Sequence, residues 1–489
     1  MIETQPLARE NADDADLRCR RLTADVIAVC VAAATTLALV LPYYARRPYW
    51  FDELVSIEIA RLDLHDFLDY VFSVEANMAL YHAVLSPWLA VSGNEAVVRL
   101  LSILFAVGTL PYLYGLALRL FDRRTAVIAV LLMSVNVSYV GFARDARSYA
   151  LALFLVTASS YYLVGAVEGH RRRDWGVYAV LAALAVWAHL FAGLVVAAQV
   201  AWLLFERRTI PRGQVLRAVA VVAALIVPLV LAIAVGGQGA QLDWLGRPGF
   251  RKLPGLFEWF AESPATLVVY FAGGVSALGP ALGEWRPDNN RQPRRYAFLL
   301  LWLLLPALIA FAVSFATPVY LYRYFLVCLP ALILFVASGF ARLRPVWLGI
   351  GLAAVALALS IRTVESCQPD CKIRYDDWKA AAAYVQARSR PGDAVVFYPA
   401  EVRTPLAHYL RGTRPRLLVP VRWGLIGGAA EGASSLDTAM REVGRYQRVW
   451  LVTWWLPSEQ AHEALTHRAT LLAAREFQGN IHIELYRPR

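Results

Sequence analysis

The sequence carries little charge for its length. Only 17% of its 489 residues are charged, whereas 58% are hydrophobic, and a soluble chain has about 25% charged residues. With 15 Trp, 23 Tyr and 21 Phe, this composition excludes a disordered chain, a coiled coil and a collagen-like chain. It also argues against an ordinary soluble enzyme.

The sequence lacks the motifs typical of nucleotide, nucleic-acid and zinc binding. We find no nucleotide-binding fingerprint, no basic run interleaved with aromatic residues and no Cys/His cluster with zinc spacing. The net charge of +11 is therefore assigned to basic loops of a membrane protein rather than to nucleic-acid binding. No internal repeat of the solenoid type and no low-complexity segment is present.

Cysteine is scarce, with five residues in total. Cys367 and Cys371 lie four positions apart in CQPDC. They would form a tight disulfide if this segment lies outside the cytoplasm, and would otherwise be two free thiols.

Long apolar runs predict a polytopic α-helical membrane protein. Residues 1–21 are polar and are expected to form a cytoplasmic tail. The run 22–44 is too long for a signal peptide and no small-residue cleavage site follows it, so it is predicted to be the first membrane helix. Ten further runs lie at 97–120, 125–141, 148–168, 175–190, 191–205, 215–235, 264–282, 297–316, 319–340 and 345–361, which makes about 11 spans.

Arginine-rich loops predict the orientation. With a cytoplasmic N-terminus, the inner loops are FDRRT, EGHRRRDW, FERRTIPR, EWRPDNNRQPRR and FARLRP, as the positive-inside rule expects. The short apolar run 79–92 is predicted to be interfacial or re-entrant, because counting it as a span would move these loops outside. We therefore expect a transmembrane domain over 22–362, with an outer loop at 45–96.

The C-terminal region, 363–489, loses the membrane-like pattern and is expected outside the cytoplasm. DDWKAAAAYVQARSRPGD predicts a helix and a turn, AVVFYP and RVWLVTWW predict buried strands, and EQAHEALTHRATLLAA predicts a helix. Alternating elements of this kind predict a small α/β domain.

Two adjacent carboxylates follow the first membrane helix. Asp52 and Glu53 begin a segment in which apolar residues recur at three- and four-residue steps, which predicts an amphipathic helix on the membrane surface. A carboxylate held there could act as a general base on an acceptor hydroxyl. The alternative is a helix N-terminus that carries acids to match its dipole.

Arginines at the predicted outer surface form a second group. Arg144, Asp145, Arg147 and Tyr149 lie in GFARDARSYA, and Tyr322 and Arg323 begin a late span. Arginine presents a planar fork suited to phosphate. The alternative is a set of snorkelling arginines and an aromatic belt.

Four more residues are candidates for positioning a donor or an acceptor. Glu75, Tyr81 and His82 lie before and within the run 79–92, and His189 lies in the apolar stretch VWAHLFAG. The first three could return to the cavity that Asp52 faces, or could belong to an ordinary polar loop. A lone His in an apolar stretch is more often a packed residue than a ligand.

The order of these motifs is similar to that of a known family. YWFDELVSIEIA, EANMALYHAVLSPWLAVSGNEAVVRLLSILFAVG, GFARDARSYALALF, AHLFAGLVVAAQ, YRYFLVCLPAL and DDWKAAAAYVQARSRPGDAVVF follow one another along nearly the whole chain. The series resembles the C-type membrane glycosyltransferases (GT-C), in particular the bacterial branch related to protein O-mannosyltransferases and the lipid A aminoarabinose transferase.

The resemblance implies an enzyme that takes a sugar from a polyprenyl-phosphate carrier at the outer face of the bacterial inner membrane. The family's acidic base corresponds to Asp52, with Glu53 beside it, and its phosphate-binding arginines correspond to Arg144, Arg147 and Arg323. Glu75 and Tyr81 match an acid and a Tyr of the aminoarabinose transferase, but Ala76 replaces the Lys that follows, and Asn77-Met78 replaces a Pro-Pro pair. Aminoarabinose is therefore not assigned. No metal is strictly required, although some relatives use a divalent cation, and the acid-rich loop keeps that option.

The sequence thus predicts a membrane glycosyltransferase acting on a glycolipid, an envelope glycan or a protein. A transporter or flippase of lipid-linked saccharide is the first alternative, although the paired halves with broken helices of many transporters are not seen. A glycan ligase or polymerase and a non-catalytic scaffold are the others.

Overall fold

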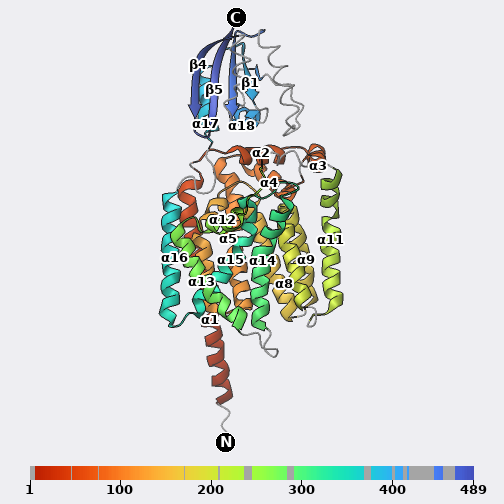
Figure 1. Ribbon diagram of the computed structural model, residues 1–489, viewed down its shortest axis with the longest axis vertical. Coiled ribbons are helices and arrows are strands. Elements are labelled where there is room, and N and C mark those ends of the chain that lie inside the picture. The colour runs from red at the N-terminus through yellow and green to blue at the C-terminus, as the bar shows by residue number, and fades with distance from the viewer. Residues whose placement is uncertain are drawn as a thin grey trace.

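The computed structural model consists of a bundle of long helices with a small sheet domain on one end (Figure 1). It describes residues 6–45, 47–74, 76–169, 171–206, 210–235, 245–283, 291–367, 376–398, 402–410, 416–417, 445–454 and 469–489. We call the end of the bundle beneath the sheet domain the domain end, and the opposite end, from which α1 extends, the N-terminal end.

The long helices of the bundle are α1 (Pro6–Tyr44), α5 (Glu95–Leu120), α6 (Arg123–Val135), α7 (Val137–Ala143), α8 (Tyr149–Gly169), α9 (Arg172–Ala188), α10 (Ala192–Glu206), α11 (Arg212–Val235), α13 (Pro264–Gly283), α14 (Arg291–Val313), the 3-10 helix η2 (Tyr322–Cys328), α15 (Leu329–Arg342) and α16 (Val346–Ser366). Each of the 11 predicted apolar runs falls on one of these helices or on a consecutive pair.

Seven described segments are long and apolar enough to cross a membrane, and α6 with α7 makes an eighth if that pair, bent by 58°, is one span. The other three predicted runs fall on α9, α10 and α13, which miss this criterion within the described residues. The expectation of a multi-pass membrane protein is confirmed, and the count of 11 stays a prediction.

Burial separates central from peripheral helices. The span Tyr322–Arg342 has 94% of its window buried, whereas Arg212–Val235 has 22%. Apolar side chains such as Leu216 and Leu231 are exposed on α11. A helix this apolar that leaves such side chains uncovered is suited to face lipid.

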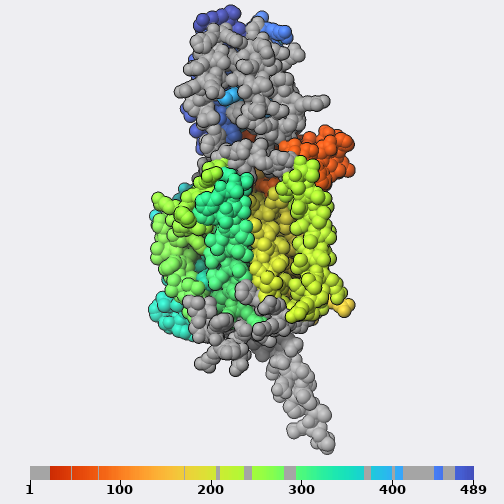
Figure 2. Space-filling model, turned by 45° about the vertical axis from the view of Figure 1, so that its right-hand side comes forward, coloured from red at the N-terminus to blue at the C-terminus, as the bar shows by residue number. Residues whose placement is uncertain are grey.

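Short helices lie across the domain end: α2 (Phe51–Ala60), α3 (Leu64–Ser73), α4 (Ala79–Val91) and α12 (Lys252–Ala261). The predicted amphipathic segment is thus two helices, because the chain turns at 61–63 and the Asp63 side chain caps α3 by accepting from the Asp66 amide at 2.9 Å. Leu64 and Phe72 remain exposed on α3, which lies at the rim of the bundle above α11 (Figure 2). Such exposure suits a helix at a membrane surface.

The sheet domain has five strands in the order β2-β1-β3-β5-β4. The strands β1 (Asp393–Tyr398), β2 (Arg416–Leu417) and β3 (Arg448–Trp454) are parallel, and β5 (Ile481–Pro488) runs antiparallel to β3 and to β4 (Ala469–Phe477). The helix α17 (Trp378–Arg388) precedes β1, and α18 (Arg403–Tyr409) lies between β1 and β2. Cys367, which follows α16, is disulfide-bonded, and Cys371 lies outside the described residues.

The predicted helix in EQAHEALTHRATLLAA is wrong over 469–474, where the chain forms β4. Gly479 and Asn480 adopt left-handed backbone conformations, with φ of 97° and 59°, and make the three-residue turn that pairs β4 with β5. The alanine-rich composition favoured a helix, but pairing with a neighbouring strand decides the conformation of such a segment. Residues 455–468 lie outside the described part of the chain.

The sheet domain contacts α2 and α5 through several side chains. The ring of Trp454 stacks on Phe51 at a centroid distance of 4.8 Å. His408 Nδ1 lies 3.3 Å from Glu58 Oε1, and the Tyr409 hydroxyl donates to Glu95 Oε1 at 3.1 Å. The domain is therefore docked on the helix that carries Asp52.

Replacing Trp454 by Ala is expected to loosen α2. A stacked aromatic pair is worth about 0.5–1.5 kcal/mol beyond its area burial, so amide exchange over residues 51–60 should accelerate roughly 2- to 10-fold. Hydrogen–deuterium exchange with mass spectrometry measures this. The control is Phe477→Ala, which removes an aromatic ring packed on Tyr384 inside the sheet domain; equal acceleration in both variants would contradict a role of the stack.

Candidate functional site

The two predicted acids begin α2 but face different surroundings. Trp50 is the N-cap residue, and its amide donates back to Glu53 Oε2 at 3.2 Å. Successive residues on an α-helix point about 100° apart. Because the first turn of α2 directs the Glu53 side chain into the protein interior, the Asp52 side chain points to a different side of the helix.

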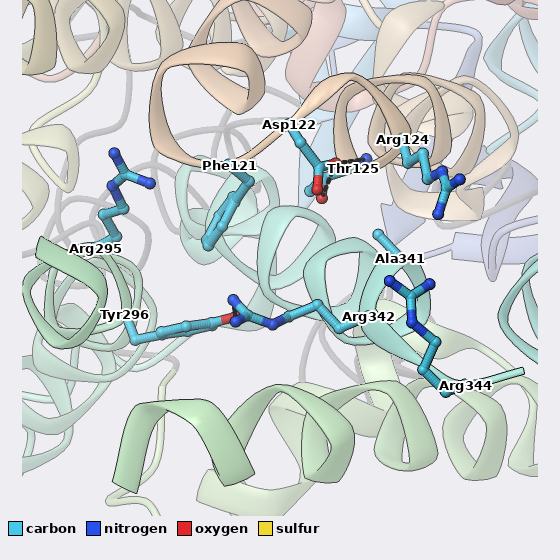
Figure 3. A pocket seen from close by; sticks show the side chains of 9 residues that line it. All are labelled: Phe121, Asp122, Arg124, Thr125, Arg295, Tyr296, Ala341, Arg342 and Arg344. Atoms are coloured by element: carbon cyan, nitrogen blue, oxygen red, sulfur yellow. Dashed lines mark hydrogen bonds between the residues drawn. The ribbon is translucent and has the colours of Figure 1, made fainter. Parts of the chain in front are cut away.

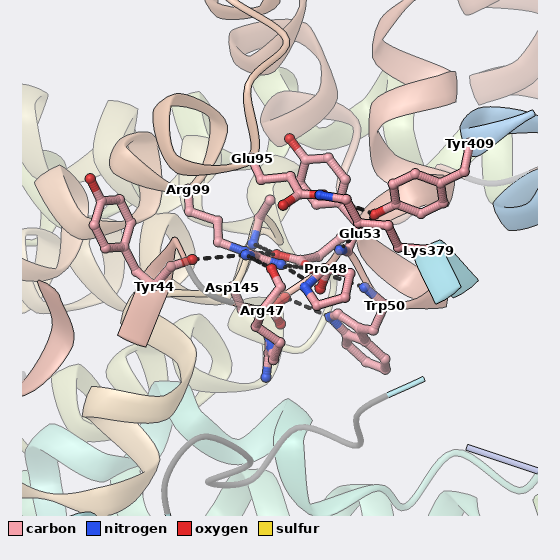
Figure 4. A network of polar contacts seen from close by, with 12 residues as sticks. Tyr44, Arg47, Pro48, Trp50, Glu53, Glu95, Arg99, Asp145, Lys379 and Tyr409 are labelled. Carbon is pink, nitrogen blue, oxygen red and sulfur yellow. Dashed lines mark hydrogen bonds and ion pairs between the residues drawn. The ribbon is translucent and has the colours of Figure 1, made fainter. Parts of the chain in front are cut away.

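Glu53 forms a sealed ion pair with Arg99 of α5 (Figure 4). Arg99 donates to Glu53 Oε1 at 2.7 Å and to Oε2 at 2.6 Å, and both side chains are 0% exposed. The remaining Arg99 donors reach the carbonyls of Tyr44, Arg47 and Pro48 at 2.8, 2.6 and 2.9 Å. All five N–H groups of the guanidinium are thus used.

These partners stabilise the ionised form of Glu53. Burial by itself would raise the pKa of Glu53, but the charge and hydrogen bonds of Arg99 outweigh it and lower that pKa. The Ala146 amide also donates to Glu53 Oε1 at 2.9 Å. Glu53 therefore ties together α2, α5 and the α7–α8 turn.

Asp52 lies between two guanidinium groups. Its Oδ2 is 3.2 Å from Arg323 Nη1 and 3.8 Å from Arg147 Nη2. Arg147 is held on α2 by bonds to the Asp52 carbonyl at 3.1 Å and to Ser56 Oγ at 2.8 Å. The Asp52 side chain is 18% exposed, so it is accessible where Glu53 is not.

Asp145 is the third acid of the cluster. Its Oδ1 accepts from the Trp50 indole N–H at 2.8 Å. Burial raises the pKa of Asp145, and the nearby charge of Glu53 raises it further. The Asp145 side chain is therefore drawn toward its neutral form and holds Trp50 in place.

Aromatic and histidine side chains border Arg323. The His189 ring lies 5.6 Å from the Tyr149 ring and 5.0 Å from the Tyr324 ring, and Arg323 lies over Tyr324 at 5.8 Å. Tyr149 is within electrostatic reach of Arg323, Arg147 and Asp52. Five of the predicted residues thus lie around one site: Asp52 of α2, Arg147 of the α7–α8 turn, Tyr149 at the start of α8, His189 of the α9–α10 turn and Arg323 of η2.

Tyr81 and His82 lie beside the same cluster. Both are buried on α4, and Arg147 lies within electrostatic reach of each. In the described part of the chain, neither ring nitrogen of His82 has a hydrogen-bond partner. The predicted return of this segment toward Asp52 agrees with these positions.

Tyr322, Arg144 and Glu75 are the remaining predicted residues. Tyr322 packs beside Trp259, at 6.4 Å between ring centroids, and under the Lys252 ammonium at 4.9 Å, toward α12. Arg144 is buried at the C-cap of α7, and its contact with a ligand stays a prediction. Glu75 lies outside the described residues.

Sequence reasoning missed Arg99, Trp50 and Tyr324. Arg99 had a usable signal, because an arginine inside an apolar helix is costly and needs a partner. Trp50 and Tyr324 had none beyond their place beside Asp52 and Arg323. Within the described ranges, no group of three or more His, Cys, Asp or Glu side chains is arranged to hold a metal ion.

Comparisons with known proteins show what this chain is similar to. The profile of the family described as "Dolichyl-phosphate-mannose-protein mannosyltransferase" matches residues 76–232. ArnT from Cupriavidus metallidurans in the apo state is similar in structure, with a TM-score of 0.64 at 14% identity, covering 94% of this chain and 97% of that chain. The same ArnT bound to undecaprenyl phosphate gives a TM-score of 0.61 at 13% identity, with the same coverage.

A more distant match is the oligosaccharyltransferase AglB from Archaeoglobus fulgidus in complex with an inhibitory peptide and a dolichol-phosphate. Its TM-score is 0.54 at 11% identity, covering 87% of this chain and 69% of that chain. No curated protein matches the chain. The predicted resemblance is confirmed in fold: this chain is a multi-pass membrane protein that shares the fold of the GT-C glycosyltransferases such as ArnT, and its residues 76–232 match the family model of the protein mannosyltransferases.

Proposed function

We propose that this protein transfers a sugar from a polyprenyl-phosphate carrier to an acceptor hydroxyl of a glycolipid, an envelope glycan or a protein. One observation carries the proposal: a partly exposed carboxylate, Asp52, lies between the guanidinium groups of Arg147 and Arg323 at the domain end. Such a reaction needs positive charge to stabilise the phosphate leaving group and a general base to accept the acceptor's proton. The two arginines offer the first and the carboxylate offers the second.

In the proposed reaction the acceptor oxygen attacks the anomeric carbon. The bond between that carbon and the phosphate oxygen breaks, and polyprenyl phosphate leaves with the bonding electron pair. Arg323 and Arg147 stabilise the charge that develops on the phosphate. Asp52 accepts the acceptor's proton. A single displacement of this kind inverts the anomeric configuration.

Without a donor, Asp52 is the anion that faces both arginines. A donor phosphate that pairs with the same guanidinium groups competes with the carboxylate for them. Asp52 is then released from its ion pairs and is available to the acceptor hydroxyl. Donor binding would in this way activate the base.

Glu53 and Arg99 act as positioning residues. They are sealed from solvent and fully paired, so Glu53 is not proposed as the base even though it neighbours Asp52. Their bonds fix the first turn of α2 and the loop before it. A carboxylate must be held in place to act as a base in the transition state.

Tyr149, His82 and His189 are proposed to contact the sugar or the acceptor. Among the described residues, the Tyr149 hydroxyl, both His82 ring nitrogens and His189 Nε2 are buried without a hydrogen-bond partner. Buried polar atoms of this kind cost free energy until a partner satisfies them, and sugar hydroxyls are suitable partners. Glu75, Tyr81, Asp145, Arg144 and Tyr322 are kept as further candidates for positioning.

The similar proteins support a lipid carrier. One ArnT structure is bound to undecaprenyl phosphate, and the AglB structure holds a dolichol-phosphate. For this chain we further propose the outer face of the bacterial inner membrane, with the N-terminus in the cytoplasm and residues 363–489 outside, because the arginine-rich loops all join helices at the N-terminal end. The disulfide of Cys367 agrees with an oxidising compartment.

A transfer assay tests the proposed function. Purified protein in nanodiscs is supplied with single polyprenyl-phosphate monosaccharides, each labelled in the sugar, and with extracted envelope glycans and lipids. The proposal predicts labelled acceptor and free polyprenyl phosphate for one donor. If no donor is consumed while labelled lipid changes leaflet in sealed vesicles, the protein is a flippase and the proposal is wrong.

Arg323→Gln is expected to lower kcat/KM for the donor about 10²- to 10³-fold, the usual effect of removing one donor to a developing oxyanion. Gln keeps a hydrogen-bonding group but removes the charge that faces the phosphate. Steady-state transfer rates at varied donor concentration measure the effect. Arg251→Gln, at an exposed arginine of the same end, should change little, and equal losses in both variants would contradict a specific phosphate contact.

A further inference from the structure

A second polar site lies at the N-terminal end of the bundle. It is a cavity of about 430 Å³, which is within the range of ligand pockets. Its lining includes Arg124, Arg295, Arg342 and Arg344 (Figure 3). Arg124 lies in the first turn of α6 and Arg295 in α14, while Arg342 ends α15 and Arg344 follows it. The length of α5 separates the cavity from the Arg99–Glu53 pair, roughly 30 Å at 1.5 Å per residue.

The cavity has a surplus of positive charge. Its lining contains four arginines and one acid, Asp122. The Asp122 carboxylate already accepts from the Thr125 amide at 2.8 Å and from its hydroxyl at 3.0 Å, as the N-cap of α6. No carboxylate of the described chain lies within ion-pair distance of Arg124, Arg295 or Arg344. Within the described residues, the one acid therefore does not neutralise the guanidinium groups of Arg124, Arg295 and Arg344.

Gathering like charges around one space costs free energy unless an anion joins them. Basic loops of a membrane protein explain arginines at this end, but they do not explain why three segments distant in sequence bring them to one cavity. Arg342 Nη1 donates to the Tyr296 hydroxyl at 3.4 Å, and the Tyr296 ring lies 5.4 Å from that of Phe121. The site thus combines a cationic rim with an aromatic wall.

We infer that this cavity binds the phosphate headgroup of an anionic membrane lipid. Guanidinium forks donate pairs of hydrogen bonds to phosphate oxygens. The aromatic pair offers contact to the glycerol and the first methylenes of the chains. Basic pockets between helix ends at a membrane surface suit such headgroups. The apolar helices α6 and α14 begin at this end of the bundle, and α15 ends there. The inference is independent of the reaction proposed at Asp52.

Native mass spectrometry of the full-length protein in detergent tests this. The protein is titrated with dioleoylphosphatidylglycerol, with the zwitterionic dioleoylphosphatidylcholine, and with inorganic phosphate as a competitor. The pocket variant is Arg124→Gln with Arg344→Gln. The control is Arg172→Gln with Arg173→Gln, which removes two exposed arginines from the start of α9.

We expect the wild type to bind phosphatidylglycerol more tightly than phosphatidylcholine. The pocket variant should lose roughly 30-fold in affinity for the anionic lipid, at about 1 kcal/mol for each arginine, and the control should be unchanged. Equal affinities in the pocket and control variants would overturn the inference. Displacement of the lipid by millimolar inorganic phosphate would overturn the assignment to a lipid headgroup and make a soluble anion the ligand.

Discussion

Asp52→Asn is expected to lower the rate of sugar transfer by about 10²- to 10⁴-fold, the contribution that a positioned general base makes. Asn has nearly the same shape as Asp but cannot accept the proton of the acceptor hydroxyl. The variant also removes the anion that competes with the donor phosphate for Arg147 and Arg323. The loss should therefore fall on kcat, while the KM for the donor should stay the same or decrease.

Asp69→Asn is the matched control, because Asp69 is a carboxylate of α3 that is 71% exposed. Transfer rates, the donor KM and the apparent Tm are measured for both variants. Transfer by Asp52→Asn at near the wild-type rate would remove Asp52 as the base. A raised donor KM with an unchanged kcat would instead make it a binding residue.

Arg99→Leu is expected to destabilise the protein by about 3–5 kcal/mol, because it leaves Glu53 as a buried charge without its partner. Three backbone carbonyls, those of Tyr44, Arg47 and Pro48, also lose their donor. The change is read as a large decrease in the apparent Tm of the purified protein and in the amount of folded protein recovered.

The control for this prediction is Arg61→Leu. Arg61, the C-cap residue of α2, pairs with Glu58 at 2.9 Å, with the two side chains 31% and 11% exposed. A pair that is open to solvent is worth about 0–1 kcal/mol. The apparent Tm of the Arg61→Leu variant should therefore change little. Similar decreases in both variants would show that the burial of the Arg99–Glu53 pair does not matter for stability.

Local patterns were sufficient to predict most of the helical bundle. Each predicted apolar run falls on a helix, and the short run 79–92 became α4 at the domain end. These predictions succeeded because a spanning helix satisfies its backbone within its own segment. The strand β4 could not be predicted in the same way, since its hydrogen bonds are made with β5.

The different environments of Asp52 and Glu53 also depend on distant partners. Both acids were predicted as candidates from their position after the first span. Their difference comes from Arg99, 46 positions beyond Glu53, and from Arg147 and Arg323, which other turns bring to Asp52. A single sequence holds no record of such contacts, although an arginine within an apolar run indicated that a partner was needed.

The most direct test of the central claim is to identify which bond of the donor breaks during transfer. A polyprenyl-phosphate sugar is prepared with ¹⁸O in the bridge between the anomeric carbon and phosphorus, and the products are analysed by mass spectrometry after transfer by the wild-type protein. Attack at the anomeric carbon predicts that the ¹⁸O leaves with polyprenyl phosphate. Finding the ¹⁸O in the sugar-bearing product would mean that phosphorus is attacked, and would contradict the roles given to Asp52, Arg147 and Arg323.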